Sequence, residues 1–365
     1  MPAAGVCLGW MGAVVHMRHS GEEKKMPVFP AVLAVAAVLV FLFLAGFLME
    51  RLGRENHQPT SDIKTVEEMM ASSGEGEAPV YFGGKWYIRT PEVEAYLLMG
   101  IDRSGQAESV GSYIGGGQAD VLLLLVVNPS DQSYRILQIN RDTMTEVDIL
   151  GVRGDIAGTQ LQQIALAHGY GEGLEDSCEN TVRAVSNLLY GMEIDGYAAI
   201  QMDALPILND GIGGVTVTVE DDFSQVDPSL VQGETIRLKG EQALHFVRIR
   251  YDVGDATNLS RMERQRTYLS AFSSQLESEF ERQPDLILKL YDDVLPYMVT
   301  DITGKTMSQM AQQYRSYENR GLLTIDGEAK MGEKYMEYYA DEDSVRQVVL
   351  ELFYTQTDTE EHTGG

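Results

Sequence analysis

The 365-residue chain has few cysteines and few basic residues for its length. Its two cysteines, Cys7 and Cys178, cannot form a disulfide framework. Lysine and arginine total 28 against 55 aspartates and glutamates, which gives a formal net charge of -27. Nucleic-acid binding draws its affinity from surplus basic side chains that displace counterions. The composition therefore argues against a nucleic-acid partner, and a local cluster of basic residues must serve something small or local.

One long apolar segment, VFPAVLAVAAVLVFLFLAGFLM at residues 28–49, carries no charge. Its length matches the roughly 20 residues that a helix needs to cross a bilayer. A cleaved signal peptide is the alternative, but its apolar region is typically shorter and ends near a small-residue cleavage site, which this sequence lacks. The segment predicts a single-pass protein of the cell membrane, with a cytoplasmic N-terminus and an extracellular main domain. Cys7 and Cys178 then lie on opposite sides of the membrane.

After the apolar segment, short apolar runs alternate with helical patterns, which is typical of an α/β domain with a mixed central sheet flanked by helices. Gly83 and Gly84 lie between two aromatic pairs and predict a hairpin. Beyond about residue 276 the patterns become helical. We divide the chain into a cytoplasmic segment (1–27), a transmembrane helix (28–49), a juxtamembrane linker with a hairpin (50–88), an α/β domain (89–275), a helical C-terminal extension (276–355) and a disordered tail (356–365).

Two acidic residues stand at the ends of predicted strands. Asp102 ends the strand in AYLLMGID, and Asp120 begins the strand in DVLLLLVV. If the latter strand pairs antiparallel with YRILQI across the turn NPSDQS, Asp120 lies opposite Asn140 and Arg141. Two carboxylates beside a glycine-rich loop suit Mg²⁺, which takes one or two carboxylates together with phosphate oxygens and water. The alternative is that both acids cap turns.

Five arginines and no lysine occur in RIRYDVGDATNLSRMERQR, residues 248–266. FVRIR predicts an extended chain in which Arg248 and Arg250 share one face. The following helix, capped by Asn258 or Ser260, places Arg261 and Gln265 on one face. Such fork-shaped donors suit the planar recognition of phosphate oxygens. A salt-bridged surface formed with the acidic residues of the same segment explains the pattern equally well.

His168 and Cys178 raise the possibility of a thiol nucleophile with a base, yet no signature of a cysteine hydrolase surrounds them. A small buried cysteine is the commoner situation. The sequence therefore favours a structural role for Cys178.

The chain resembles the LytR-CpsA-Psr family of membrane-anchored phosphotransferases of Gram-positive bacteria. The resemblance is carried by LLMGID, ADVLLLLVVNP, INRDT, LNDGIGGVTVTV, LKGEQALHFVRIR and SRMERQR, in the family's order and spacing from about residue 96 to 272. It implies an enzyme that moves a glycopolymer with one phosphate from a polyprenyl-pyrophosphate carrier to a peptidoglycan hydroxyl, assisted by Mg²⁺. A pyrophosphatase that uses water and a non-catalytic binder of lipid-linked intermediates remain alternatives.

The resemblance also implies roles for individual residues. Asp102 and Asp120 would face the metal. The residues that would bind the pyrophosphate are Arg141, Arg248, Arg250, Arg261 and Gln265. The sequence departs from many members at Gln118-Ala119, where they carry Arg-Ser, at Asn140, where they carry proline, and at Thr145, where some carry arginine. These departures predict that the substrate head is gripped differently, and they leave the glycopolymer class open.

Overall fold

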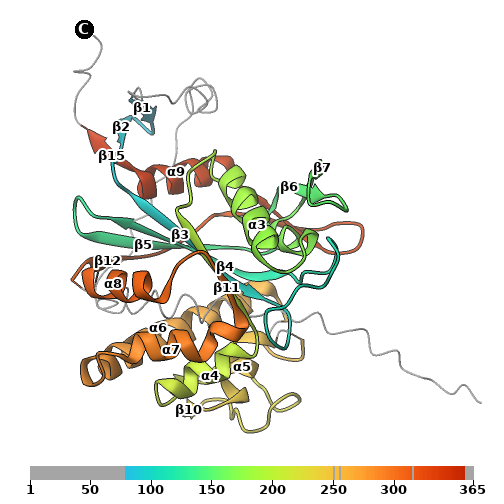
Figure 1. Cartoon of the computed structure of the whole chain (residues 1–365), viewed down its shortest axis with the longest axis vertical. Helices are drawn as coiled ribbons and strands as arrows, with labels where there is room; N and C mark the ends of the chain where they lie inside the picture. The colour runs from blue at the N-terminus through green and yellow to red at the C-terminus, as the bar shows by residue number, and fades with distance from the viewer. Residues whose placement is uncertain (1–78, 250, 255, 315, 358–365) are drawn as a thin grey trace, which may run out of the picture.

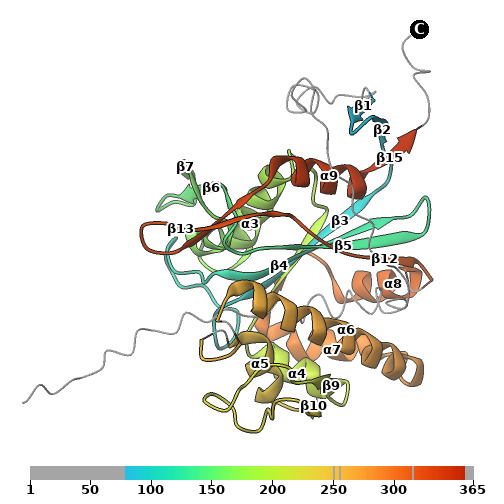
Figure 2. The same ribbon diagram turned by 180° about the vertical axis from the view of Figure 1, so that it is seen from behind.

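The computed structural model describes residues 79–249, 251–254, 256–314 and 316–357 (Figures 1 and 2). The predicted cytoplasmic and transmembrane segments, the linker up to residue 78, Arg250 and the tail from residue 358 lie outside the described residues. Within the described ranges, no helix is long and apolar enough to cross a membrane.

A six-stranded mixed sheet forms the centre of the molecule, with the strand order β11-β8-β3-β4-β5-β12. Its strands are β3 (Glu94–Ile101), β4 (Ala119–Asn128), β5 (Ser133–Ile139), β8 (Gly196–Gln201), β11 (Met298–Thr300) and β12 (Glu318–Thr324). The pairs β3-β4, β4-β5 and β8-β11 are antiparallel, whereas β3-β8 and β5-β12 are parallel. The predicted mixed sheet and the predicted pairing of DVLLLLVV with YRILQI are confirmed.

Helices cover both faces of the sheet (Figures 1 and 2). One face carries α3 (Glu175–Leu188) and α9 (Glu342–Phe353); the other carries α4 (Ala204–Gly211), α5 (Glu241–Arg248), α6 (Asn258–Arg282), α7 (Leu286–Val294) and α8 (Gly304–Tyr314). Strand β4 explains this arrangement, because Leu123 and Leu125 enter one core while Leu122 and Leu124 enter the other. A continuous apolar run is what a strand buried on both faces requires.

Smaller elements surround this framework. They are β1 (Val80–Phe82), β2 (Lys85–Arg89), β6 (Met144–Leu150), β7 (Ile156–Gln163), β9 (Val215–Thr218), β10 (Thr235–Leu238), β13 (Gly327–Met331), β14 (Met336–Ala340), β15 (Tyr354–Thr357) and the 3₁₀ turns η1 (Ile164–Leu166), η2 (His168–Tyr170) and η3 (Leu295–Tyr297). The predicted hairpin is β1-β2, and β15 extends it to three strands. Its turn residues Gly83 and Gly84 both have positive φ, which glycine adopts without a steric penalty.

The chain beyond residue 276 is not purely helical, which differs from the prediction of a helical extension. Helices α7, α8 and α9 bear out part of the predicted helical extension, but strands lie between them. Strands β11 and β12 form the two edges of the central sheet. Neither shows a strand pattern in the sequence, because β11 has only three residues and β12 is half-buried without alternation.

The prediction of an extended FVRIR segment was wrong. Helix α5 continues through Phe246 and Val247 to Arg248, and the first residue with extended backbone is Ile249. The helix forms because Ala243, Leu244, Phe246 and Val247 are all buried, a spacing that fits one helical face. Helix α6 begins after Thr257, whose hydroxyl accepts a hydrogen bond from the Ser260 amide at 3.1 Å, so the predicted caps at Asn258 and Ser260 were also wrong.

Candidate active site

A β-bulge in β4 turns the side chain of Asp120 away from the direction that a regular strand would give it. Gly100 pairs with Val121 and Ile101 pairs with Ala119, which leaves Asp120 as the extra residue of β4. Ala119 packs into one core and Val121 into the other. Bulges redirect side chains and occur often beside active sites. The carboxylate of Asp120 consequently lies at the sheet end with no exposed side-chain area.

Arg141 follows β5 and contacts this carboxylate directly, as the antiparallel pairing predicted. Its Nη1 donates to Asp120 Oδ1, and its Nη2 donates to Gln118 Oε1 at 2.5 Å. Its Nε lies 3.3 Å from Asp142 Oδ1. The guanidinium is thus fixed on three sides. Asp142 helps to orient Arg141.

Asp102 follows β3 and is connected to Arg141 through Gln118. The Asp102 amide donates to the Gln118 carbonyl at 3.0 Å, and Asp102 Oδ1 accepts from the Gln118 amide at 2.5 Å. The side chain of the same Gln118 receives the Arg141 bond. In the sequence, Gln118 stands out only as a departure from the family pattern. The structure makes it the residue that joins the two strand ends.

Arg261 reaches the same carboxylate from α6, on the opposite side from Arg141. Its Nη1 lies 3.8 Å from Asp120 Oδ2, and its Nη2 donates to Asn258 Oδ1 at 2.5 Å. The Asn258 amide in turn donates to Asn140 Oδ1 at 2.7 Å. Arg261 has no exposed area, so this asparagine pair holds a buried cation in place. Neither asparagine was predicted to take part in the site.

Arg248 and Gln265 lie at the junction of α5 and α6. Burial lowers the pKa of Arg248, and the negative charges of Asp102 and Asp120 oppose that shift, so the guanidinium lies within electrostatic range of both acids. Gln265 is buried, and its amide donates to the Val247 carbonyl at 3.3 Å. The described structure therefore engages Gln265 with the backbone of α5. Arg250, the remaining predicted residue, is outside the described ranges.

Arg264 is buried near Arg248 and Gln265, and its guanidinium bonds to Asp221 and to two backbone carbonyls. Its Nε donates to the Phe246 carbonyl at 3.1 Å, its Nη1 donates to Asp221 at 2.7 Å, and its Nη2 donates to the Ile249 carbonyl. These bonds join the end of α5 to α6. They give Arg264 a structural role.

The two carboxyl groups differ from ordinary exposed acids. Burial raises the pKa of Asp120 to about 7, although Arg141 and Arg261 act in the opposite direction. Burial also raises the pKa of Asp102, against the Gln118 amide and the charges of Arg141 and Arg248. Asp120 Oδ2 accepts no hydrogen bond from any described residue. A buried carboxylate oxygen without a donor is a place where a cation or a donor of the substrate fits.

The described residues contain no cluster of three or more His, Cys, Asp or Glu side chains arranged to hold a metal. Asp102 and Asp120 would therefore supply a cation with only two carboxylates. Mg²⁺ is bound in this manner when waters and substrate phosphates complete its octahedron. The donor set fits Mg²⁺ as a partner of a phosphorylated substrate.

A glycine-rich loop, residues 103–118, carries Gln118 into the site and is fixed by the turn that contains η2. The Gly115 amide donates to the Gly169 carbonyl at 3.0 Å, and Nδ1 of His168 lies 3.3 Å from the Gly117 carbonyl. A side chain at Gly116 would lie 2.7 Å from the Gly171 carbonyl oxygen. The loop thus touches the turn closely at its C-terminal end. The arrangement does not resemble a nucleotide cradle.

His168 and Cys178 form a buried contact, with 3.9 Å between Nε2 and Sγ. Burial lowers the pKa of His168 to about 4 and raises the pKa of the Cys178 thiol. A reactive cysteine needs an accessible thiolate. The pair lacks this property, and the structural role predicted for Cys178 fits its environment.

Comparison with known proteins identifies the family. The model of the LytR_cpsA_psr family matches residues 60–353. A curated relative from Halalkalibacterium halodurans, the polyisoprenyl-teichoic acid–peptidoglycan teichoic acid transferase TagU, is 31% identical over 80% of this chain and 89% of its own length. The TagU of Bacillus licheniformis is 24% identical over 92% of this chain and 98% of its own. The crystal structure of B. subtilis TagV matches 71% of this chain and 95% of its own, with a TM-score of 0.55 and 22% identity. The chain belongs to the LytR_cpsA_psr family.

Proposed function

We propose that the chain is a phosphotransferase that moves a glycopolymer with one phosphate from a polyprenyl-pyrophosphate carrier to a hydroxyl of peptidoglycan. The names of its curated relatives support a transferase that joins a polyisoprenyl-linked teichoic acid to peptidoglycan. The observation that carries the proposal is the buried Asp120, with Arg141 and Arg261 on its two sides. Arginines placed beside a carboxylate suit a pyrophosphate, because the guanidinium groups can bind its oxygens and the carboxylate can hold a cation that neutralises its charge.

In this proposal Asp102 and Asp120 hold Mg²⁺. The metal would neutralise charge on the phosphate oxygens. The support is the donor set itself, which has the buried carboxylate of Asp120, the half-buried carboxylate of Asp102 and one oxygen, Asp120 Oδ2, without a hydrogen bond from the described residues.

We assign the binding of the substrate's phosphate groups to the arginines. Arg141, Arg248 and Arg261 bind the phosphate oxygens and stabilise the charge that develops during transfer. The acceptor oxygen forms a bond with the sugar-proximal phosphorus while the bridging P–O bond breaks. The bridging oxygen leaves as part of polyprenyl phosphate, and the proton of the acceptor hydroxyl ends on that product. Catalysis of this kind rests on positioning and charge stabilisation. The bonds of Arg141 to Gln118 and of Arg261 to Asn258 supply that positioning.

We also propose that residues 28–49 anchor the chain in the cell membrane with the N-terminus in the cytoplasm. A lipid-linked donor lies in the bilayer, and the apolar segment has the length to span it. Protease added to intact cells should digest the domain after residue 50 and spare an N-terminal tag. Protection of the domain would contradict this topology.

The transfer reaction can be tested with purified full-length protein, Mg²⁺ and a synthetic polyprenyl-pyrophosphate-linked glycopolymer. With peptidoglycan present, we expect polymer linked to peptidoglycan through a phosphodiester. Free polymer phosphate, formed equally with and without peptidoglycan, would identify a hydrolase instead. Donor binding without any turnover, unchanged in Asp102→Ala and Asp120→Ala, would identify a non-catalytic binder and overturn the proposal.

A further inference from the structure

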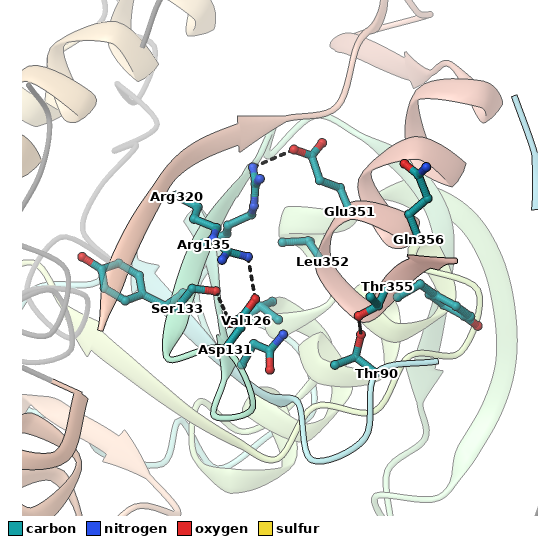
Figure 3. Close-up of a pocket in the computed structure, with 13 residues that line it drawn as sticks. Thr90, Val126, Asp131, Ser133, Arg135, Arg320, Glu351, Leu352, Thr355 and Gln356 are labelled. Carbon is teal, nitrogen blue, oxygen red and sulfur yellow. Dashed lines mark hydrogen bonds and ion pairs between the residues drawn. The ribbon is translucent and has the colours of Figure 1, made fainter. Parts of the chain in front are cut away.

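A cavity of about 220 Å³ is lined by residues of β4, β5 and the turn between them (Figure 3). The strand register places it at the opposite end of β4 and β5 from Asp120 and Arg141. Its walls come from the β4-β5 turn, β12, the end of α9 and β15. The lining is mainly polar, and Val126 and Leu352, which are almost fully buried, contribute a small apolar area. None of the residues predicted for the active site lines this cavity.

The charges in the cavity wall compensate one another. Arg135 Nη1 lies 2.6 Å from Glu351, and Arg320 Nη1 lies 2.6 Å from Asp131. These two arginines and two carboxylates leave a net formal charge of zero. An anion or a cation would have to displace an existing ion pair, and a ligand gains little from doing so at a partly exposed site. The wall therefore favours an uncharged ligand.

The remaining polar groups both donate and accept hydrogen bonds. The hydroxyls of Thr90 and Thr355 are 2.8 Å apart, and the Ser133 hydroxyl donates to Asp131 at 2.6 Å. These bonds hold the groups in place, and each threonine hydroxyl can still bond to a ligand because a hydroxyl has one donor and two acceptor sites. The side-chain amides of Asn128 and Gln356 add further donors and acceptors.

The cavity is smaller than the about 300–1,000 Å³ typical of drug-sized ligands. It admits a group of roughly one ring. A ring that presents hydroxyls at its rim and C–H groups on its face matches the polar wall and the apolar area of Val126 and Leu352. We infer that this cavity binds one uncharged sugar ring of a carbohydrate chain. This site does not depend on the proposed transfer, because it lies at the other end of the strands and uses no phosphate chemistry.

Saturation-transfer NMR on the full-length protein in detergent tests the inference, with an N-acetylglucosamine tetramer and maltotetraose as probes and without any lipid-linked donor. We expect saturation of one or both sugars. Thr355→Trp should abolish it by filling the cavity. Gln356→Ala should raise the Kd about three- to tenfold, which corresponds to one lost hydrogen bond.

Gln225→Ala is the matched control, because Gln225 is exposed and lies outside the cavity. It should leave binding unchanged, and equal melting temperatures of all variants would show that their folds are intact. Three results would overturn the inference. They are no saturation of either sugar, saturation that Thr355→Trp does not alter, and full displacement of the sugar by inorganic phosphate, which would indicate an anion site.

Discussion

At the scale of the residue, one bulge in β4 determines how Asp120 can act. In a regular ladder Asp120 would alternate with Ala119 and Val121, but the extra residue turns its carboxylate towards α6, where Arg261 reaches it. Two guanidinium groups then compensate a buried carboxylate from two elements. Breaking a buried pair costs far more than an exposed pair contributes, since the remaining charge cannot return to water.

Arg261→Met should lower the free energy of unfolding by about 3 kcal/mol, since Asp120 would lose one of its two compensating charges and Asn258 its donor while both stay buried. Urea unfolding measures this change. Asp131→Asn removes a carboxylate from a partly exposed pair with Arg320 and should cost under about 1 kcal/mol. Equal losses for the two variants would mean that burial does not distinguish them.

Arg248→Ala should reduce the transfer rate roughly a hundredfold, the typical effect of losing one preorganised charge-assisted donor. The side chain is only partly buried at the end of α5, so the fold should survive. Rate measurement at saturating donor provides the test. Arg266→Ala is the control, because Arg266 pairs with Glu263 at 3.2 Å on the surface of α6. The assignment of Arg248 would not stand if both variants kept normal rates.

At the scale of the element, the loop of residues 103–118 links the site to the turn behind it. Its last residues pass so close to the turn at residues 168–173 that Gly116 has no room for a side chain. Gln118 follows two residues later and bonds both Asp102 and Arg141. A shift of the loop would therefore move Asp102 and Arg141 through their bonds to Gln118.

Gly116→Ala should decrease the transfer rate, because the new Cβ would lie 2.7–2.8 Å from three backbone atoms of the turn and displace the loop. Crowding of this kind costs about 1–3 kcal/mol. Transfer kinetics and thermal unfolding measure the two effects. Gly158→Ala is the matched control, since a Cβ at that position in β7 meets nothing within 4 Å. Similar behaviour of the two variants would argue against loop positioning.

His168 should make the protein less stable in acid. Its pKa falls from 6.5 to about 4 on folding because burial disfavours the charged ring. The unfolded chain therefore binds more protons between pH 6.5 and 4, so the contribution of His168 to stability is complete above pH 6.5 and declines as the pH falls to 4. The limiting slope is about 1.4 kcal/mol per pH unit. Unfolding of the wild type and of His168→Gln across this range should differ in slope, and parallel curves would contradict the prediction.

At the scale of the whole molecule, the chain beyond residue 275 completes the sheet that carries the site. Strand β11 pairs with β8, and β12 pairs with β5. A chain ending at residue 275 would expose the edges of both β8 and β5 and the apolar faces that α7, α8 and α9 cover. The predicted domain boundary lies at this point, but the sheet order argues for one continuous unit.

Truncation after residue 275 should therefore yield protein that aggregates or stays unfolded, because unpaired strand edges and uncovered apolar faces promote association. Circular dichroism and size-exclusion chromatography would detect this. Truncation after residue 357 is the control and should leave the fold intact. A monomeric, cooperatively melting chain of 275 residues would restore the predicted boundary.

The parts of the fold that could be predicted are those that local pattern determines. The turn between β4 and β5 sets their register, so the encounter of Asp120 with Arg141 follows from the sequence. The bulge at Asp120 and the asparagine pair of Asn140 and Asn258 depend on how α6 packs against the sheet, and no local pattern records that packing. Helix α5 was mistaken for a strand because a short apolar run fits both periods.

The parallel pairing of β12 with β5 joins residues far apart in the chain, such as Thr324 and Gln138. During synthesis β5 is made long before its partner, and the apolar β4 beside it gains its full cover only when α8 and α9 follow. Contacts of such long sequence separation form slowly, and the intermediates expose apolar surface that promotes aggregation. The central sheet can therefore be completed only when nearly the whole length of the chain is available, and until then β4 presents apolar side chains that other chains could contact.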